Sequence, residues 1–208
     1  MPVIAVDGPA ASGKGTIALA LADHFGLPHM DTGLLYRAVA LTLWRWGGDP
    51  GNVFEAVRAC LDFNLDPSDP ELRSETVSQI ASAVSAYPAV RAALLDRQRS
   101  FAALPGGAVL DGRDIGTVIA PDADLKLFVT ATPEVRAKRR RAELVERGMH
   151  TQFEDVLAEI LARDARDSER IAAPLRQPAD AILLDTSALD REAAIAEAIR
   201  IAEERLNG

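Results

Sequence analysis

Short apolar runs alternate with amphipathic stretches along the chain. The first run, 3–6, is rich in β-branched residues and ends at Asp7-Gly8-Pro9, which predicts a buried strand followed by a turn. A helical repeat then stops at Gly26, a residue type that commonly caps helix C-termini. Its apolar positions are Ile17, Leu21 and Phe25. The chain is therefore expected to begin with a strand, a glycine-containing loop and a helix.

The same two patterns continue along the rest of the chain. Further strands are expected at 27–30, 108–110, 125–130 and 181–184. Helices are expected at about 34–46, at 75–103 with a break at Pro88, at 153–170 and at 191–206. Glycine, proline and aspartate punctuate residues 47–73, which predicts an irregular excursion containing a short helix. Strands that alternate with helices favour a parallel sheet covered on both faces, an α/β fold with three layers.

The composition limits the classes of protein to which the chain can belong. With 208 residues it can form one sizeable core, and no apolar run approaches the roughly 20 residues of a membrane span. The first residues lack the basic and apolar regions of a secretory signal. A formal net charge of −8 argues against a general nucleic-acid binder, and the single cysteine, Cys60, excludes an internal disulfide. We therefore expect a cytoplasmic protein with no membrane or nucleic-acid partner.

The first loop has the spacing of a phosphate-binding loop. Gly8-Pro9-Ala10-Ala11-Ser12-Gly13-Lys14-Gly15-Thr16 fits the pattern G-x-x-x-x-G-K, with a predicted strand before it and a helix after it. Glycines let backbone N–H groups surround phosphate oxygens, and the helix adds its positive N-terminus. Lys14 supplies a mobile charge for the β- and γ-phosphates of ATP. Because Gly15 follows the lysine, the hydroxyl comes one place later, so we expect no direct metal ligand and a contact from Thr16 to Mg²⁺ through a water.

Two further segments place charges beside the ends of predicted strands. Asp111-Gly112-Arg113-Asp114 follows the strand at 108–110, at the edge where ligands gather in open α/β sheets. Buried charges need partners, so these residues either hold a ligand or form an Asp–Arg pair that tightens the turn. Arg37, in Asp31-Thr32-Gly33-Leu34-Leu35-Tyr36-Arg37, is either a ligand contact or an ordinary residue on a helix surface.

The helix predicted at 153–170 changes character along one face. Its apolar positions are Phe153, Val156, Leu157, Ile160 and Leu161. At about 100° per residue, Arg163, Asp167 and Arg170 fall on or beside the extension of that stripe. A surface helix keeps its charges on the opposite face. This half of the helix is therefore expected to line a polar cleft.

These motifs resemble those of bacterial cytidylate kinases. Residues 31–37 are similar to the family's D-[ST]-G-x-x-Y-R segment, and residues 111–117 to D-G-R-D-[IM]-G-T, which adenylate and guanylate kinases do not carry. Residues 163–175 are similar to R-D-x-R-D-x-x-R-x-x-x-P-L, and G-K-G-T is the form of the first loop found in nucleoside monophosphate kinases. The resemblance extends from Ile4 to about Leu206.

The resemblance implies an acceptor site for CMP or dCMP. Thr32, Arg37 and Arg113 would hold the 5′-phosphate of the acceptor. Asp114 would accept a hydrogen bond from the cytosine amino group and so select cytosine over uracil. The remaining expected contacts of the base are Ser82 and Arg91.

The resemblance also implies roles for the charged helix. Arg163 and Asp167 would contact the phosphate and sugar of the acceptor. Arg166 and Arg170 would lie near the transferring phosphoryl group, so together with Lys14 they are the candidate catalytic residues. Arg170 is also expected to contact the substrate. The basic run 136–141 is either a nucleic-acid patch or, as we prefer, the source of an arginine beside the adenine or the phosphates, namely Arg139 or Arg140.

The fold implied by the resemblance is that of a P-loop NTPase with a five-stranded parallel sheet, a short NMP-binding insertion and a helical lid. We expect a single monomeric domain over 1–208. Its core would comprise about 1–60, 104–146 and 171–208, its NMP-binding region 61–103, and its lid 147–170. Bacterial cytidylate kinases usually carry an antiparallel β insertion that residues 61–75 are too short to form. The preference among CMP, dCMP and UMP is therefore left open.

The activity implied by the resemblance is transfer of the ATP γ-phosphoryl group to CMP or dCMP, giving CDP or dCDP and ADP, with Mg²⁺ accompanying ATP. Two other interpretations remain open. One is another small-molecule P-loop kinase, acting on UMP or on a metabolite such as shikimate, against which residues 111–117 argue. The other is a non-catalytic nucleotide-binding regulator, which would not need the arginines of a second phosphate site: Arg37, Arg113, Arg163 and Arg170.

Overall fold

The computed structural model describes residues 2–207 and, in that range, contains one sheet of five parallel strands. The strands lie in the order β2-β3-β1-β4-β5; they are β1 (Val3–Asp7), β2 (His29–Asp31), β3 (Ala108–Gly112), β4 (Leu125–Thr130) and β5 (Ile182–Asp185). All five expected strands are confirmed, with bounds that shift by a residue or two. Asp111 and Gly112, expected just after the third strand, belong to β3 itself.

Eight α-helices lie between and after these strands within the described range. They are α1 (Lys14–Phe25), α2 (Thr32–Arg45), α3 (Val53–Asp62), α4 (Glu75–Val84), α5 (Pro88–Ala102), α6 (Pro133–Glu146), α7 (Phe153–Glu169) and α8 (Arg191–Asn207). Two shorter turns are the 3₁₀ turn η1 (Pro70–Arg73) and the π-helical turn η2 (Ile115–Ile119). The break expected at Pro88 is confirmed, because that residue begins α5. The turn η2 was not expected.

Local side chains determine several helix ends. Asn52 accepts hydrogen bonds from two backbone N–H groups at the start of α3, and Ser74 accepts one at the start of α4. Gly26 ends α1 in the left-handed conformation at φ 65°, as the sequence predicted. These caps fix where the chain enters α3 and α4 and where it leaves α1.

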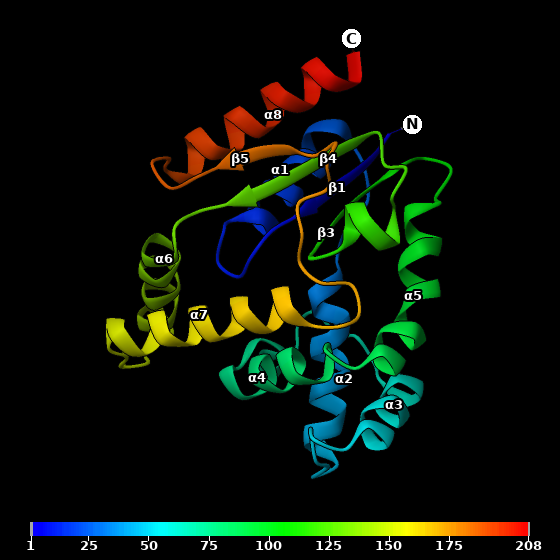
Figure 1. Ribbon diagram of the computed structural model, residues 1–208, viewed down its shortest axis with the longest axis vertical. Helices are drawn as coiled ribbons and strands as arrows, with labels where there is room; N and C mark the ends of the chain where they lie inside the picture. The colour runs from blue at the N-terminus through cyan, green and yellow to red at the C-terminus, as the bar shows by residue number, and fades with distance from the viewer. Residues whose placement is uncertain (1, 208) are drawn as a thin grey trace.

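Helices cover both faces of the sheet, which confirms the three-layer α/β/α fold (Figure 1). α1 and α8 pack on one face, where Val6 meets Leu21 and Ala198. On the other face, Ala102 at the end of α5 and Ile115 of η2 pack against β1 and β3. The strands are therefore buried on both sides, as is usual for a parallel sheet.

Helices α2 to α5 form a second packed unit, below the sheet in Figure 1, which we call the helical body. Its core includes Leu35 and Leu43 of α2, Ala59 of α3, Val77 of α4 and Leu94 of α5. The structure describes every residue of 63–74, and none of them is in a strand, as the shortened insertion predicted. The division into core, NMP-binding region and lid stays a prediction. By packing alone, α2 and α3 group with α4 and α5.

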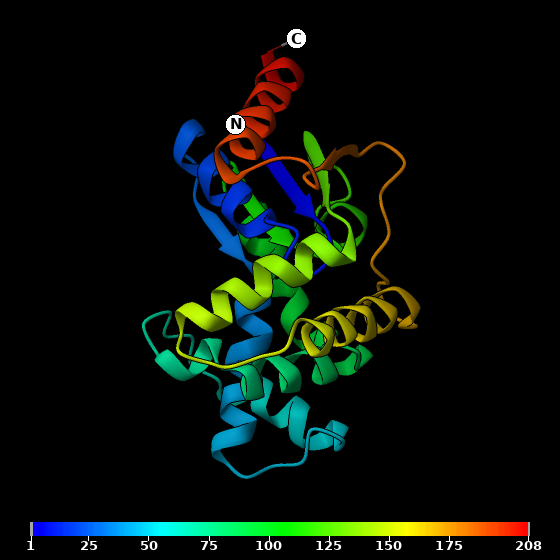
Figure 2. The same cartoon turned by 90° about the vertical axis from the view of Figure 1, so that its left-hand side faces the viewer.

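α6 and α7 pack as a pair around Ala137, Leu144 and Val156, between the sheet and the helical body (Figure 2). The inward stripe of α7 is confirmed for Val156 and Ile160, but the prediction for Leu161 is wrong, because that side chain is 49% exposed. One residue turns a helix by about 100°, which moves Leu161 from the buried face that Ile160 occupies toward the solvent. Residues 147–152, expected to belong to a helical lid, form a turn at 147–148 and then a loop between the two helices.

No helix in the described range 2–207 is long and apolar enough to cross a membrane.

Candidate functional site

The carboxyl ends of β1, β2 and β3 open into a cleft of about 670 Å³. The first loop, the helical body and α7 form its walls, at the edge where open parallel sheets bind ligands. Lys14 and nine arginines line it, including the six arginines of the predicted site: Arg37, Arg91, Arg113, Arg163, Arg166 and Arg170. Cations gathered in one cleft of a chain with formal net charge −8 indicate an anionic ligand.

The loop between β1 and α1 has the backbone that phosphate binding requires. A Cβ at Gly8 would lie 2.0 Å from the backbone oxygen of Val129, so only glycine fits there. Ala11 and Gly13 adopt positive φ angles of 57° and 89°, which curl the loop. Because Gly13 offers no side chain to cap α1, the first N–H groups of that helix remain available to an anion.

Side chains from α6 and from the segment after β5 hold the carbonyls of this loop. Nη1 of Arg136 donates to the Ala10 oxygen at 3.2 Å, and Nη1 of Arg139 to the Ser12 oxygen at 3.4 Å. The Thr186 hydroxyl donates to the same Ser12 oxygen at 3.2 Å. Arg139 therefore holds the loop backbone in this structure and does not line the cleft, whereas the other candidate of that run, Arg140, does line it.

Lys14, Arg113 and Arg163 bring three positive charges together in the cleft. Burial and the charge of Arg113 lower the pKa of Lys14 to about 8. The same two causes lower the pKa of Arg163 to about 10. Nε of Arg163 is buried and has no hydrogen-bond partner in the described part of the chain. A bound phosphate would offset this repulsion and supply the missing acceptor.

Arg37 enters the cleft from α2. Its Nη1 donates to the Ser78 hydroxyl at 2.6 Å and to the Leu72 oxygen at 3.3 Å, and burial lowers its pKa. The Thr32 hydroxyl donates to the Asp111 oxygen at 2.8 Å and so ties the start of α2 to β3. Because the Thr32 hydroxyl already donates its hydrogen bond to the Asp111 backbone carbonyl, a contact of Thr32 with a phosphate stays a prediction.

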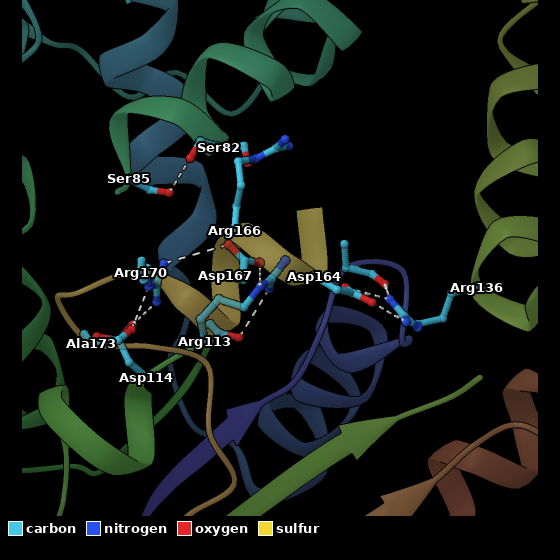
Figure 3. A network of polar contacts seen from close by, with 12 residues as sticks. Ser82, Ser85, Arg113, Asp114, Arg136, Asp164, Arg166, Asp167, Arg170 and Ala173 are labelled. Atoms are coloured by element: carbon cyan, nitrogen blue, oxygen red, sulfur yellow. Dashed lines mark hydrogen bonds and ion pairs between the residues drawn. The ribbon is translucent and has the colours of Figure 1, made fainter. Parts of the chain in front are cut away.

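Asp114 and Asp167 join Arg113 and Arg170 into one network (Figure 3), because Arg170 lies near both carboxylates, at 3.7 Å from Asp114 and 3.9 Å from Asp167. Arg91 forms an ion pair with Asp114, and Nη2 of Arg170 lies 3.7 Å from the second oxygen of Asp114. Nε of Arg113 donates to Asp167 at 2.7 Å. Burial raises the pKa of Asp167, but the charges of Arg113, Arg163 and Arg170 and the hydrogen bond from Arg113 together outweigh burial, so the pKa is lowered. Both carboxylates are therefore held as acceptors inside the cleft.

Arg166 spans from α7 to the helical body. Its Nε and Nη2 both lie 3.4 Å from the hydroxyl of Ser82, which is buried on α4 (Figure 3). Arg170 lies beside Asp114, the predicted base contact, and donates from Nε to the Ala173 oxygen at 2.7 Å. Roles for Arg166 and Arg170 beside the transferring phosphoryl group stay predictions.

Two residues that support the walls of the cleft were missed in the sequence. Arg136, only 3% exposed, donates to both oxygens of Asp164 at 3.0 and 2.6 Å and also to the Ala131 oxygen. Nε2 of His29 lies 2.8 Å from a carboxylate oxygen of Asp111. In the sequence, Arg136 is one of four arginines in a short basic run, and nothing local marks it as the buried one.

Two contacts join the C-terminal half of α6, and the residue after it, to the helical body. Arg140 forms an ion pair with Glu75 at the start of α4, and Nη1 of Arg147 donates to the Arg73 oxygen at 3.1 Å. All four residues line the cleft. The walls of the cleft are therefore linked on the side of α6 as well as through Arg166.

The oxygen donors around the first loop suit a cation that arrives with a nucleotide. In the range 2–207, no group of three His, Cys, Asp or Glu side chains could hold a metal by itself. Thr16 lies in the first turn of α1, and an oxygen of Asp111 is 3.8 Å from the place of a Cβ at Gly15. Mg²⁺ prefers oxygen ligands, keeps several waters and takes others from phosphates, so these donors fit it.

The family model described as cytidylate kinase matches residues 4–204. A cytidylate kinase from Xanthobacter autotrophicus is 58% identical over 208 residues, which cover 99% of each chain. The chain belongs to the cytidylate kinase family.

Other cytidylate kinases are also similar to the chain over most of its length. A cytidylate kinase from Methylocella silvestris is 56% identical over 97% of this chain and 94% of the relative, and one from a Methylobacterium species is 61% identical over 86% of each. Because the Xanthobacter relative aligns over 99% of both chains, it has no room for a long extra insertion. The shortened region is therefore not peculiar to this chain.

Two solved structures share the fold at low sequence identity. An uncharacterized protein from Eubacterium ventriosum has a TM-score of 0.59 at 15% identity, and the match covers 98% of each chain. A protein from Thermus thermophilus has a TM-score of 0.51 at 22% identity, covering 100% of this chain and 99% of that one. These structures support the fold and nothing finer.

Proposed function

We propose that the chain transfers the γ-phosphoryl group of ATP to CMP or dCMP, giving CDP or dCDP and ADP. Membership of the cytidylate kinase family supports the reaction class. The observation that carries the two-substrate geometry is the convergence of Lys14, from the first loop, with Arg113 and Arg163 in one cleft. A protein that only bound ATP would need the loop but not a second set of phosphate-binding cations.

The donor half of the site is the first loop. Its backbone N–H groups, from Ala10 to Thr16, surround the phosphates of ATP, and Lys14 follows the charge on the β- and γ-phosphates. Mg²⁺, when bound with ATP, neutralises charge on the β- and γ-oxygens. Thr16 and Asp111 are the residues that would hold its water ligands.

The acceptor half uses the opposite walls. Arg37, Arg113 and Arg163 bind the 5′-phosphate of CMP. Asp114 accepts from the cytosine amino group while keeping its ion pair with Arg91, because two carboxylate oxygens offer about four acceptor sites. Uracil presents a carbonyl oxygen at the same place, so an acceptor-only carboxylate disfavours it.

Transfer itself requires positioning and charge stabilisation. The acceptor is already an ionised phosphate, so its oxygen attacks the γ-phosphorus in line and needs no strong base. Lys14 and the arginines of α7 and its C-terminal end, Arg166 and Arg170, stabilise charge on the equatorial oxygens of the transferring group. Closure of residues 147–170 over the cleft excludes water. We propose further that the protein is a cytoplasmic monomer.

A coupled assay of ADP release with CMP, dCMP, UMP and AMP tests this function. CMP and dCMP should give the highest kcat/KM, and UMP and AMP much lower values. Release of ADP when a metabolite such as shikimate is the acceptor, but not when a nucleoside monophosphate is, would favour a different small-molecule kinase. ATP binding without ADP release for any acceptor would favour a regulator.

A further inference from the structure

Asp7 joins the two halves of the site and has no part in the mechanism above. It is the last residue of β1 and directly precedes the first loop. Its side chain is 1% exposed, Oδ1 accepts the N–H of Ile115, and Oδ2 accepts the N–H of Gly116, both at 2.8 Å. One buried carboxylate therefore binds two successive backbone groups of a segment more than 100 residues away along the chain.

The two N–H groups begin η2. The first N–H groups of any helical turn lack acceptors inside it, and they need a cap or a ligand. Asp114, at the N-cap position, makes no side-chain cap; its side chain faces Arg91 and Arg170 in the cleft. Asp7 supplies the cap from β1 and leaves the carboxylate of Asp114 to the cleft.

Asp114 is consequently held on both sides. The ladder between β1 and β3 pairs Asp7 with Gly112, two residues before Asp114, and the two hydrogen bonds from Ile115 and Gly116 follow directly after it. The backbone of Asp114 lies at φ −145° and ψ 27°, outside helix and strand geometry. Its position relative to the first loop therefore depends on Asp7.

Burying a carboxylate at position 7 costs free energy, but only a carboxylate can accept hydrogen bonds from the N–H groups of both Ile115 and Gly116. Burial raises the pKa of Asp7 to about 6, and the negative charge of Asp114 adds to the rise, although the two N–H groups oppose it. Asparagine has the same shape but would present its own N–H₂ to one of the two donors. Apolar substitutes would leave both N–H groups buried without an acceptor.

We propose that Asp7 is a positioning residue for recognition of the acceptor base, because it holds Asp114 at a fixed place relative to the ATP-binding loop. The inference rests on the proposed function, and in particular on Asp114 as the residue that distinguishes cytosine from uracil. Asp7 does not contact either substrate; it acts through the backbone of η2.

The test compares Asp7→Asn with the unchanged protein for CMP and UMP. The ratio of kcat/KM for CMP to kcat/KM for UMP should fall about tenfold, mainly through a higher KM for CMP, because one hydrogen bond to a charged group is lost and Asp114 shifts. The KM for ATP should change less than twofold. A merely structural role would lower the melting temperature and leave the CMP/UMP ratio intact.

Asp124→Asn is the matched control. Asp124 accepts the backbone N–H of Val3 at 2.8 Å, at the opposite end of the same strand and outside the cleft. This variant should keep the CMP/UMP ratio. If Asp7→Asn does not fold, Asp7→Ser is measured instead; its smaller hydroxyl can accept one N–H and leaves room for a water, and it should show the same loss of selectivity.

A double variant separates the possible outcomes. Asp7→Asn combined with Asp114→Ala should lose no more selectivity than Asp114→Ala alone, because both changes act on one contact. A CMP/UMP ratio within twofold of the unchanged protein in the Asp7 variant overturns the inference, as do additive losses in the double variant. If the unchanged protein shows no preference for CMP, the proposed function fails instead.

Discussion

Lys14 owes its pKa of about 8 to burial and to the neighbouring charge of Arg113. Phosphate anions favour the protonated ammonium, so ATP should raise this pKa again. At a pH close to 8 the protein is therefore expected to take up protons as ATP binds. Calorimetry in buffers of different ionisation enthalpy measures the uptake, and Lys14→Met should abolish it. If the Lys14→Met variant and the unchanged protein take up the same number of protons per ATP bound, the uptake does not come from Lys14.

Lys14→Ala should abolish phosphoryl transfer. The loop N–H groups alone cannot follow charge as it moves to the bridge between the β- and γ-phosphates, so we expect kcat to fall by about a thousandfold or more. Release of ADP with saturating CMP measures the loss. Lys138→Ala, an exposed lysine on α6, is the control and should leave turnover unchanged. Turnover near the normal rate for the Lys14 variant would refute its role.

Asp114→Ala should weaken CMP binding more than ATP binding. The change removes the acceptor expected to face the cytosine amino group and leaves Arg91 without its partner, so we expect about a tenfold rise in the Kd of CMP. Calorimetric titration with each nucleotide separately gives both constants. Asp122→Ala, an exposed aspartate before β4, is the control. Equal losses for the two nucleotides would remove the role of Asp114 in base recognition.

Among the elements, those with a clear period were predictable from the sequence and η2 was not. The strands and most helices show apolar residues at regular spacing, and their bounds differ little from expectation. η2 has only five residues, too few for a period, and the hydrogen bonds at its start come from Asp7, 108 residues before Ile115. A turn that depends on so distant a residue leaves no local pattern.

The candidate site was predictable from the sequence where a motif fixes the backbone. It was less predictable where the burial of a side chain decides whether that side chain reaches the cleft. The first loop, Arg113 and Asp114 follow from glycine spacing at strand ends, and the structure brings them into one cleft. On α6, however, the arginines look alike in the sequence. Only the packing of α6 against α7 shows that Arg136 is buried, whereas Arg140 reaches the cleft.

Arg136 joins three elements, so its loss should affect more than one of them. Arg136→Met would leave the Asp164 carboxylate of α7 without its partner and release carbonyls of the first loop and of Ala131. We expect a loss of about 3 kcal/mol in the free energy of unfolding, measured by urea titration. Turnover should fall with it, because α7 carries Arg163 and Arg166.

Arg200→Met is the matched control for that experiment. Arg200 forms ion pairs with Glu197 and Glu204 on the exposed face of α8, where such pairs contribute little. Its unfolding midpoint should equal that of the unchanged protein. If the Arg136 variant shows the same midpoint and the same turnover as this control, Arg136 does not hold α6, α7 and the loop together.

For the whole molecule, the distribution of charge matters more than its sum. The net charge is −8, yet Lys14 and nine arginines line one cleft, so the remaining surface is more acidic than the total suggests. Such a cleft draws anionic substrates toward it, and salt screens the attraction.

We therefore expect kcat/KM for CMP to fall several-fold between about 20 mM and about 300 mM NaCl, with little change in kcat at saturation. Steady-state assays at constant pH and free Mg²⁺ measure the effect. Arg200→Met, which removes a positive charge far from the cleft, should show the same dependence on salt. A flat profile would mean that the cleft does not steer its substrates.

The separate core of the helical body has a consequence for how this protein can change over evolution. The chain leaves the sheet after β2 and returns only at β3, so α2 to α5 form one continuous excursion packed on their own leucines and valines. Residues can be gained or lost between α3 and α4 without disturbing the strands that carry the ATP-binding loop. The cleft residues that α2 to α5 supply, such as Arg37 and Arg91, can thus change while the first loop stays the same. Residues 32–107 are therefore the natural segment to exchange when a chimera of two relatives is made.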